Sequence, residues 1–360
     1  MERVFNFSAG PAAIDPGVLQ RAANELVCYG DKGMSVLEMS HRTPMFMDIY
    51  NETLALFRDV MGVPEGYEVL FLQGGATKEF AAIPLNLMTG SCKADYLDTG
   101  NFAHLAAEEA KKYGTVNIVA SSREDNYTYI PDLDTIAFSP DADYAYITTN
   151  NTIYGTRFVR LPDTGAVPLV ADASSNILSE PMDVSRFGVL YAGTQKNIGP
   201  AGMAIVIVRK DLLGRANPLC PKVINWAEQA KNDSMINTPN TFAIYMIKLV
   251  CEWMKANGGV PAFYATNQAK AKLLYDAIDN SKLFSNPVRK EYRSLMNVTF
   301  VTGNAEKDDA FCKYCKQNGL VNIKGHRNVG GMRASIYNAM PMAGVQKLVD
   351  VMARFERENL

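Results

Sequence analysis

The chain has 360 residues, of which 48% are hydrophobic and 21% charged, and its formal net charge is −2 at pH 7. A length of this order predicts two domains and is sufficient for a large hydrophobic core without disulfide support. The balanced charge excludes the basic excess of a dedicated nucleic-acid binder, and the composition excludes an acidic disordered chain.

Targeting signals are missing from the sequence pattern. No apolar run approaches the length needed to cross a bilayer, and the first residues lack the apolar core of a secretory signal. Six cysteines are spread thinly along the chain, which is typical of reduced thiols. We therefore expect a cytoplasmic protein with neither membrane nor nucleic-acid partners.

The N-terminal part of the chain predicts two helices. Asp15-Pro16 is typical of an N-cap followed by proline at the first helical position, and this helix is expected to reach about Tyr29. Thr43-Pro44 begins a second helix by the same logic. From Tyr67 onward, short apolar runs alternate with helical segments. The expected strands cover residues 67–72, 94–97, 116–120, 144–148, 169–171, 189–192 and 203–208.

This alternation predicts an α/β fold with a mainly parallel seven-stranded sheet covered by helices. Two long helical patterns follow Phe242 and are broken near Gly258-Gly259. The remainder mixes strands at 297–301 and 333–336 with helices, the last over 344–355. We predict a large domain of residues 16–260 and a smaller α+β domain made of residues 1–15 and 261–360.

A glycine-rich turn, Gln73-Gly74-Gly75-Ala76-Thr77, lies between an expected strand and an expected helix. Such a turn exposes backbone N–H groups and the positive end of a helix dipole, which suits a phosphate group. It matches neither the dinucleotide fingerprint nor the P-loop. Taken alone, a tight strand–helix turn explains it equally well.

Two charged residues stand in unusual surroundings. Asp172 follows the apolar run 167–171 and is expected at the carboxyl end of a strand, where ligands gather in open α/β sheets. Lys196 lies just after another strand, in an uncharged stretch rich in glycine, and burial there lowers the pKa of an amine and makes it nucleophilic. Singly, such residues are usually a turn residue and a solvated lysine.

Together, the turn, the carboxylate and the lysine indicate one cofactor. Pyridoxal 5′-phosphate needs a lysine for its Schiff base, a carboxylate that keeps its pyridine nitrogen protonated, and a backbone cradle for its phosphate. The spacing of Asp172 and Lys196 is compatible with two neighbouring strand ends.

The sequence resembles the class V aminotransferases, and among them the phosphoserine aminotransferase family, over essentially its whole length. The resemblance is carried by long stretches around Lys196 (192–202) and Arg333 (324–335), and by shorter ones at 5–11, 40–42 and 237–239. It implies the aspartate-aminotransferase-like fold, a homodimer with shared active sites and pyridoxal 5′-phosphate as the cofactor.

The resemblance also implies roles for cofactor-binding residues. Lys196 is expected to form the Schiff base and to shuttle a proton, and Asp172 to pair with the pyridinium nitrogen. Phe102 matches the ring-stacking position and Thr152 the contact to the phenolic oxygen. The phosphate is expected to be held by Ala76, Thr77 and Gln195, and by Asn237 and Thr238 from the other subunit.

The implied reaction is reversible amino transfer between glutamate and 3-phosphohydroxypyruvate, giving O-phosphoserine and 2-oxoglutarate by a ping-pong mechanism. It belongs to serine biosynthesis, and the family extends in some members to 4-phosphohydroxythreonine in vitamin B6 biosynthesis. Both substrates carry an α-carboxylate and a distal anion, which need cationic partners. The resemblance assigns the α-carboxylate to Arg333 with help from Ser8, and the distal anion to His41, Arg42, His326 and Arg327.

The sequence departs from the family at two places, and two alternative functions stay open. The family often has Trp where this chain has Phe102, and a phosphate turn richer in glycine and arginine than Ala76-Thr77. Another class V enzyme, such as a serine–glyoxylate aminotransferase or a cysteine desulfurase, is one alternative, and a non-catalytic phosphate-binding module is another. Cys312 and Cys315 have the spacing of a metal or redox pair, but a structural helix face explains them better, so no metal is expected.

Overall fold

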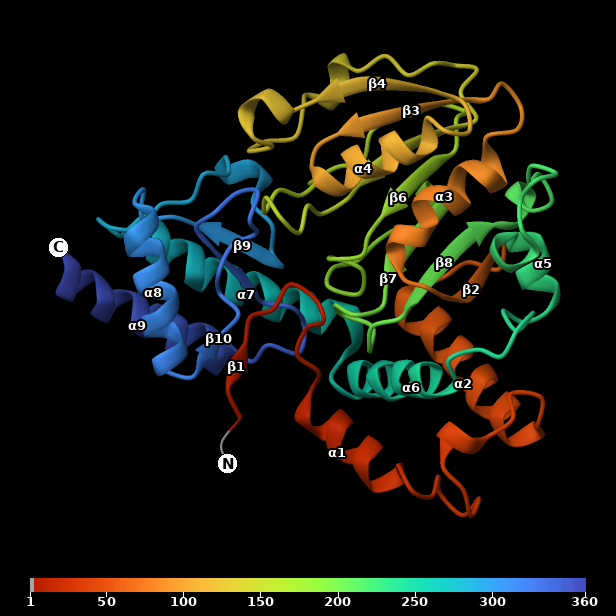
Figure 1. Ribbon diagram of the computed structural model, residues 1–360, viewed down its shortest axis with the longest axis horizontal. Coiled ribbons are helices and arrows are strands. Elements are labelled where there is room, and N and C mark those ends of the chain that lie inside the picture. The colour runs from red at the N-terminus through yellow and green to blue at the C-terminus, as the bar shows by residue number, and fades with distance from the viewer. Residues whose placement is uncertain (1–2) are drawn as a thin grey trace.

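The centre of the molecule is a seven-stranded sheet, seen in a computed structural model that describes residues 3–360 (Figure 1). Its strand order is β2-β8-β7-β6-β5-β3-β4. Neighbouring strands are parallel from β7 to β4, whereas β8 runs antiparallel to both β2 and β7. The predicted mainly parallel α/β sheet is therefore confirmed. The strands are β2 (Tyr67–Gln73), β3 (Lys93–Asp98), β4 (Thr115–Ser121), β5 (Tyr144–Thr148), β6 (Leu169–Asp172), β7 (Val189–Gly193) and β8 (Met203–Arg209).

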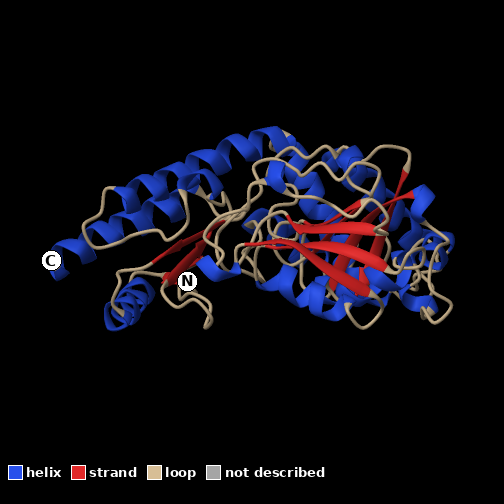
Figure 2. Cartoon of the chain, turned by 90° about the horizontal axis from the view of Figure 1, so that it is seen from above, coloured by secondary structure: helices blue, strands red, loops and turns tan. Residues whose placement is uncertain are grey.

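Helices cover both faces of this sheet, as the view from above shows (Figure 2). The strands β5, β6 and β7 are buried at every position, which explains why they read as continuous apolar runs rather than as alternating patterns. One face packs against α3 (Ala76–Leu87), α4 (Asn101–Ala110) and α5 (Trp226–Lys231). The other packs against α2 (Pro44–Met61) and α6 (Thr241–Ala256).

The first helix is shorter than the sequence predicts. In α1 (Pro16–Glu25), the Asp15 carboxylate accepts a hydrogen bond from the Gly17 N–H at 2.8 Å, as expected for an N-cap. The helix ends at Glu25 rather than near Tyr29. The next residues, Leu26 and Val27, are 42% and 82% exposed, so no burial against this chain stabilises another turn.

A smaller lobe of helices and short strands lies beside the sheet (Figure 1). We call it the C-terminal lobe and call the rest the sheet lobe. Its core gathers Phe7 with residues from 271 to 355, including Phe300, Phe311 and Phe355. The N-terminal segment adds a short strand to it, parallel to β10 (Leu320–Val321). Its elements are β1 (Phe5–Asn6), α7 (Gly259–Asp279), β9 (Asn297–Phe300), α8 (Ala305–Gln317), β10 (Leu320–Val321), β11 (Met332–Ser335) and α9 (Met342–Asn359).

The carboxyl ends of β5, β6 and β7 meet at one edge of the sheet. There Asp172 is paired in register with Thr148 on one side and with Tyr191 on the other. The loops that leave these strands face the C-terminal lobe, so this edge is where the fold predicts a ligand site. Within residues 3–360, no helix combines the length and the apolar character that crossing a membrane requires.

Candidate active site

Lys196 lies in the turn that joins β7 to β8, and its side chain reaches over the sheet edge. Its amine donates a hydrogen bond to Thr152 Oγ1 at 2.8 Å and lies 5.7 Å from the centre of the Phe102 ring. Burial lowers the pKa of this amine to about 8, while the negative charge of Asp172 raises it and the positive charge of Arg333 lowers it further. The amine is therefore partly neutral, and nucleophilic, near neutral pH.

Asp172 ends β6 and is only 5% exposed. Its Oδ1 atom accepts a hydrogen bond from the Ser174 N–H at 2.8 Å. The Ser174 hydroxyl in turn accepts one from the Gly193 N–H at 3.0 Å, which links the loop after β6 to the end of β7. These bonds hold the carboxylate in one orientation, as is needed for a group that pairs with a cofactor nitrogen.

The glycine-rich turn leads directly into α3. Gly74 and Gly75 have φ values of 108° and 77°, a backbone conformation that other residues rarely adopt. In the part of the chain that the structure describes, no side chain caps the N-terminus of α3. Its first N–H groups and its dipole are thus available to an anion, which is the arrangement that suits a phosphate.

One cavity of about 280 Å³ brings these features together. Six predicted cofactor residues line it: Ala76, Thr77, Phe102, Asp172, Gln195 and Lys196. Gly74 and Gly75, which also line it, belong to the glycine-rich turn that the sequence singled out for a phosphate. Sequence reasoning assigned no role to the remaining lining residues, which are Gly10, Pro11, Phe80, Ser174, Ala201 and Gly202.

A signal for some of these missed residues was present in the sequence. Gly10 and Pro11 belong to a stretch that carries the family resemblance, as do Ala201 and Gly202. Ser174 stands two positions after Asp172, where an aspartate side chain commonly accepts a backbone N–H bond.

The C-terminal lobe supplies Arg333 from β11. One guanidinium nitrogen of Arg333 donates to the Thr152 carbonyl oxygen at 3.3 Å. Its Nε atom is buried and has no hydrogen-bond partner within residues 3–360, and burial lowers the pKa of the group. A buried cationic donor without a partner suits an anionic ligand such as a carboxylate.

Other predicted substrate residues lie around this arginine. His326 and Arg327 belong to the loop between β10 and β11, and the pKa of His326 is lowered by burial and by the charges of Arg333 and Arg327. Ser8 lies in the N-terminal segment, where Gly10 passes close to Lys196. The loop, the N-terminal segment and Arg333 therefore approach the same edge of the sheet.

Nine predicted residues do not line this cavity, and five of them, Ser8, Thr152, His326, Arg327 and Arg333, are described above. The other four are His41, Arg42, Asn237 and Thr238. His41 and Arg42 lie just before α2, where they contact each other. Asn237 and Thr238 are exposed, and the Thr238 carbonyl accepts a hydrogen bond from the Gln73 side chain at 2.7 Å. Asn237 and Thr238 are expected to act in a second subunit, and the distal anion site that includes His41 and Arg42 is expected to be partly shared across the dimer. The position of these four residues in one chain therefore leaves their roles as predictions.

Comparison with known proteins gives a consistent assignment. The model of the aminotransferase class V family matches residues 4–348. The chain belongs to the class V aminotransferases. It is 52% identical to the phosphoserine aminotransferase of Bacillus cereus (strain ATCC 14579), over 100% of both chains. It is 53% identical to that of Listeria monocytogenes (strain EGD-e), over 99% of this chain and 97% of the relative.

Solved structures of class V aminotransferases show the same fold. Phosphoserine aminotransferase from Bacillus circulans subsp. alkalophilus superimposes with a TM-score of 0.98 at 44% identity, covering 100% of both chains. The pyridoxal-phosphate-bound phosphoserine aminotransferase of Trichomonas vaginalis gives 0.94 at 41% identity, covering 98% of this chain and 100% of the other. An aspartate aminotransferase from Thermus thermophilus, 20% identical, shares the fold with a TM-score of 0.80, which confirms the expected aspartate-aminotransferase-like architecture.

The cofactor of class V aminotransferases is pyridoxal phosphate, and the cavity fits it. It offers a buried lysine amine, a fixed carboxylate, an uncapped helix N-terminus and an aromatic ring at one site. The sheet lobe supplies all four of these groups. The N-terminal segment adds Gly10 and Pro11 to the wall of the cavity.

Proposed function

We propose that this chain is a phosphoserine aminotransferase, which transfers the amino group of glutamate to 3-phosphohydroxypyruvate and releases O-phosphoserine and 2-oxoglutarate. The observation that carries the proposal is the convergence of Lys196 and Asp172 on one cavity, in a chain half identical over its whole length to enzymes of that name. Amino transfer of this kind serves the formation of serine. The proposal places the enzyme in the cytoplasm.

We call Lys196, Asp172 and Thr152, whose hydroxyl accepts the hydrogen bond of the lysine amine, the floor. These residues bind the cofactor and move the substrate proton. Pyridoxal phosphate supplies an electron sink and carries the amino group between the two halves of the reaction. With the cofactor bound, Asp172 would hold a proton at the pyridine nitrogen by charge pairing, and Phe102 would offer the face of its ring for stacking. The Lys196 amine takes the proton from the substrate Cα, since a neutral amine is a competent base. The turn at Ala76 and Thr77, together with Gln195, binds the phosphate.

The substrate is held by its charges. Arg333 binds the α-carboxylate with help from Ser8, because a planar guanidinium matches a carboxylate in geometry and charge. His326 and Arg327 bind the distal phosphate of one substrate and the γ-carboxylate of the other. A second copy of the chain completes both sites. Its His41 and Arg42 add to the distal anion site, and its Asn237 and Thr238 add to the site of the cofactor phosphate.

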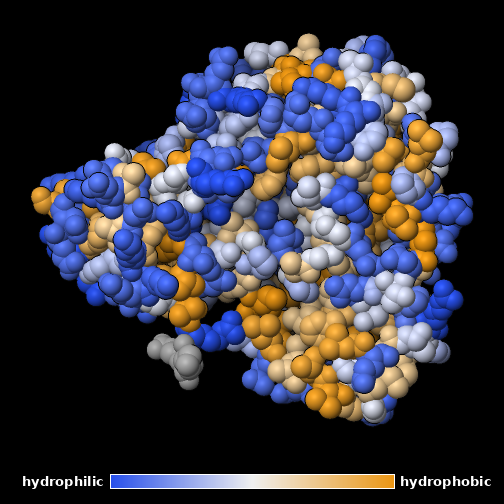
Figure 3. Space-filling model, in the orientation of Figure 1, coloured by the Kyte–Doolittle hydropathy of each residue, from blue (hydrophilic) through white to orange (hydrophobic). Residues whose placement is uncertain are grey.

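Apolar surface supports the homodimer in this proposal. Figure 3 shows orange surface over the lower part of the molecule, where α1 and α2 lie in Figure 1. Exposed apolar side chains between these helices include Leu26, Val27 and Leu37, which are 42%, 82% and 60% exposed. Exposed apolar side chains close in sequence to His41 and Arg42 are consistent with an interface with a second copy. The proposed domain boundary near residue 260 leaves the dimer-forming residues in the large domain.

The other class V activities are less well supported. A cysteine desulfurase needs a reactive cysteine at the site, but none of the six cysteines lines the cavity. Cys312 and Cys315 lie on α8, and burial raises the pKa of the Cys312 thiol to about 11. An alanine–glyoxylate aminotransferase structure is only 16% identical to this chain, which supports the shared fold alone.

A half-reaction tests the proposed function. Holoenzyme is mixed with O-phosphoserine, glutamate, alanine or serine, and the cofactor absorption is followed. We expect O-phosphoserine and glutamate to convert the cofactor at low concentration and alanine and serine to do so weakly. Equal conversion by all four amino acids would contradict a substrate site built for a distal anion.

A further inference from the structure

The two groups that meet the substrate's central carbon come from different lobes. Lys196 belongs to the sheet lobe and Arg333 to the C-terminal lobe. In the proposed function, the proton that Lys196 takes and the carboxylate that Arg333 binds are both attached to the substrate Cα, so the separation of the two side chains must be held closely. A misplacement of about 1 Å can reduce a rate by a hundredfold. The contacts between the lobes therefore bear on catalysis.

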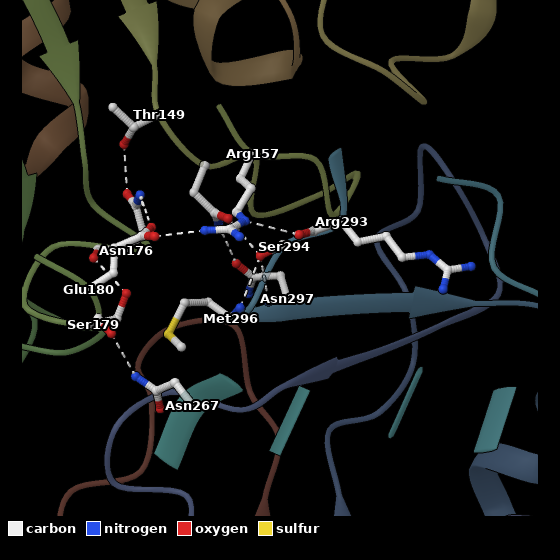
Figure 4. Close-up of polar contacts among 11 residues, drawn as sticks. Thr149, Arg157, Asn176, Ser179, Glu180, Asn267, Arg293, Ser294, Met296 and Asn297 are labelled. Carbon is white, nitrogen blue, oxygen red and sulfur yellow. Dashed lines mark hydrogen bonds and ion pairs between the residues drawn. The ribbon is translucent and has the colours of Figure 1, made fainter. Parts of the chain in front are cut away.

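Buried polar contacts fill this junction (Figure 4). Arg157 pairs with Glu180 at 2.7 Å within the sheet lobe and donates through Nε to the Arg293 carbonyl of the C-terminal lobe at 3.1 Å. On the other side, Asn267 of α7 donates to the Ser179 carbonyl at 3.0 Å. Buried hydrogen bonds are directional, so they specify one relative orientation of the lobes more strictly than apolar contacts do.

A hydrogen bond between two asparagines links the segments that carry Lys196 and Arg333. Asn197 directly follows the lysine, and Asn338 lies in the segment that follows β11 and its arginine. The Asn338 N–H donates to Asn197 Oδ1 at 3.0 Å. The Asn338 side chain donates to the Leu178 carbonyl at 2.9 Å and accepts from Asn267 at 2.8 Å. Both asparagines are only 6% exposed.

The segment around Asn338 is also held from α7. Lys270 is fully buried, and its amine donates to the carbonyl oxygens of Ile336, Tyr337 and Met340 at 3.0, 2.8 and 3.0 Å. Three carbonyls bound to one amine fix the path of this segment. The backbone beyond Arg333 is thus attached to α7 on one side and to the lysine-bearing turn on the other.

We infer that Asn197 and Asn338 are positioning residues that set Arg333 relative to Lys196, so that one substrate carbon can be held by its carboxylate and deprotonated at the same time. Neither side chain lines the cavity. They act through the two groups that do contact the substrate. The inference rests on the proposed function, because it takes Arg333 as the carboxylate-binding group.

Two unreactive ligands isolate the carboxylate contact. 3-Phosphoglycerate and glycerol 3-phosphate share the phosphate, but only the first has a carboxylate, and calorimetry measures their binding to holoenzyme. For Asn338→Ala, we expect roughly tenfold weaker binding of 3-phosphoglycerate and less than twofold weaker binding of glycerol 3-phosphate, since only the carboxylate site has moved. Asn338→Ala removes the side-chain bonds to Leu178 and Asn267, whereas Asn197→Ala removes the acceptor of the Asn338 backbone N–H. Each variant therefore loosens the attachment of this segment by a different contact, and Asn197→Ala should give the same selective loss.

Asn86→Ala is the matched control. Asn86 is a buried amide that donates to the Ala82 and Ile224 carbonyls at 2.8 Å and accepts from the Trp226 N–H at 3.0 Å, far along α3. We expect this variant to lower the unfolding temperature without changing the preference between the two ligands.

The outcomes separate the inference from the proposed function. An unchanged ligand preference in Asn338→Ala, or in Asn197→Ala if the first variant does not fold, would overturn the positioning role. A wild-type enzyme that does not prefer 3-phosphoglycerate would instead overturn the assignment of Arg333.

Discussion

The floor and the rim of the cavity are built differently. The floor is formed by Lys196, Asp172 and Thr152, which are joined to buried strand ends by hydrogen bonds within one chain. The proposed rim is formed by Arg327 of this chain and by Arg42 of a second copy, and both side chains are exposed and belong to loops. The floor is therefore preorganised by the core of the fold, whereas the rim is completed by the C-terminal lobe and, in the proposed dimer, by a second copy. In the proposed function, the chemistry common to the family depends on the floor residues, and the choice of substrate depends on the rim residues.

Removal of the floor lysine should have the largest effect. We expect Lys196→Ala to lower kcat with O-phosphoserine by about 10⁴-fold or more, because both the covalent link to the cofactor and the base are lost. Lys231→Ala, an exposed lysine paired with Glu228, is the control and should keep full activity. If Lys196→Ala kept its turnover, another amine would have to bind the cofactor and act as the base.

The floor carboxylate should come next. Asp172→Asn keeps the shape and the acceptor for the Ser174 N–H but loses the charge at the pyridine nitrogen. We expect kcat to fall by roughly 10²-fold to 10³-fold, while cofactor affinity falls far less. Equal losses of kcat and of cofactor affinity would indicate that Asp172 is merely structural.

The electrostatics of the floor predict a pH profile. The pKa of the Lys196 amine is lowered to about 8, so the rate of cofactor uptake by apoenzyme should rise about tenfold per pH unit below that value and level off above it. Because Arg333 lowers this pKa and Asp172 raises it, Arg333→Met should move the profile to higher pH and Asp172→Asn to lower pH. Stopped-flow absorbance measures all three profiles, and shifts in the same direction would contradict the assigned charges.

The same pKa shift affects stability. The folded apoenzyme releases the Lys196 proton near pH 8, whereas the unfolded chain releases it near 10.5. Between these values the unfolded state binds more protons, so this lysine makes the unfolding free energy rise with pH. Denaturant unfolding of apoenzyme and of Lys196→Met across this range isolates the contribution, which should be absent in the variant.

Substitution at the rim should change binding rather than chemistry. We expect Arg327→Ala and Arg42→Ala each to raise KM for O-phosphoserine and glutamate together by about tenfold, since both substrates use the distal anion site. The unfolding free energy should change by no more than about 0.5 kcal/mol, because both side chains are exposed. If neither variant changed KM for either substrate, the assignment of the distal anion site to these arginines would be wrong.

The aromatic wall should give the smallest effect. Phe102→Leu keeps apolar bulk but loses the ring face, so we expect cofactor affinity to fall by about three- to tenfold. Phe102→Trp should restore or exceed the original affinity. A loss in both variants would indicate that the ring fills space without stacking on the cofactor.

Sequence reasoning recovered the floor better than the rim. Apolar runs ending in Asp172, and the uncharged stretch around Lys196, are local patterns with local causes, so the strands and the cavity edge could be predicted. The early end of α1 could not, because Leu26 and Val27 look helical but face away from this chain. The asparagine link at residues 197 and 338 also escaped, since an amide has no sequence signal for a partner in another lobe.

The central claim is that the amine of Lys196 is the one that binds the cofactor. Borohydride reduction of holoenzyme followed by peptide mass spectrometry tests it directly. The account predicts a reduced pyridoxyl group on the peptide that contains Lys196 and on no other lysine. A modified Lys78, or a holoenzyme with no covalent label, would contradict it.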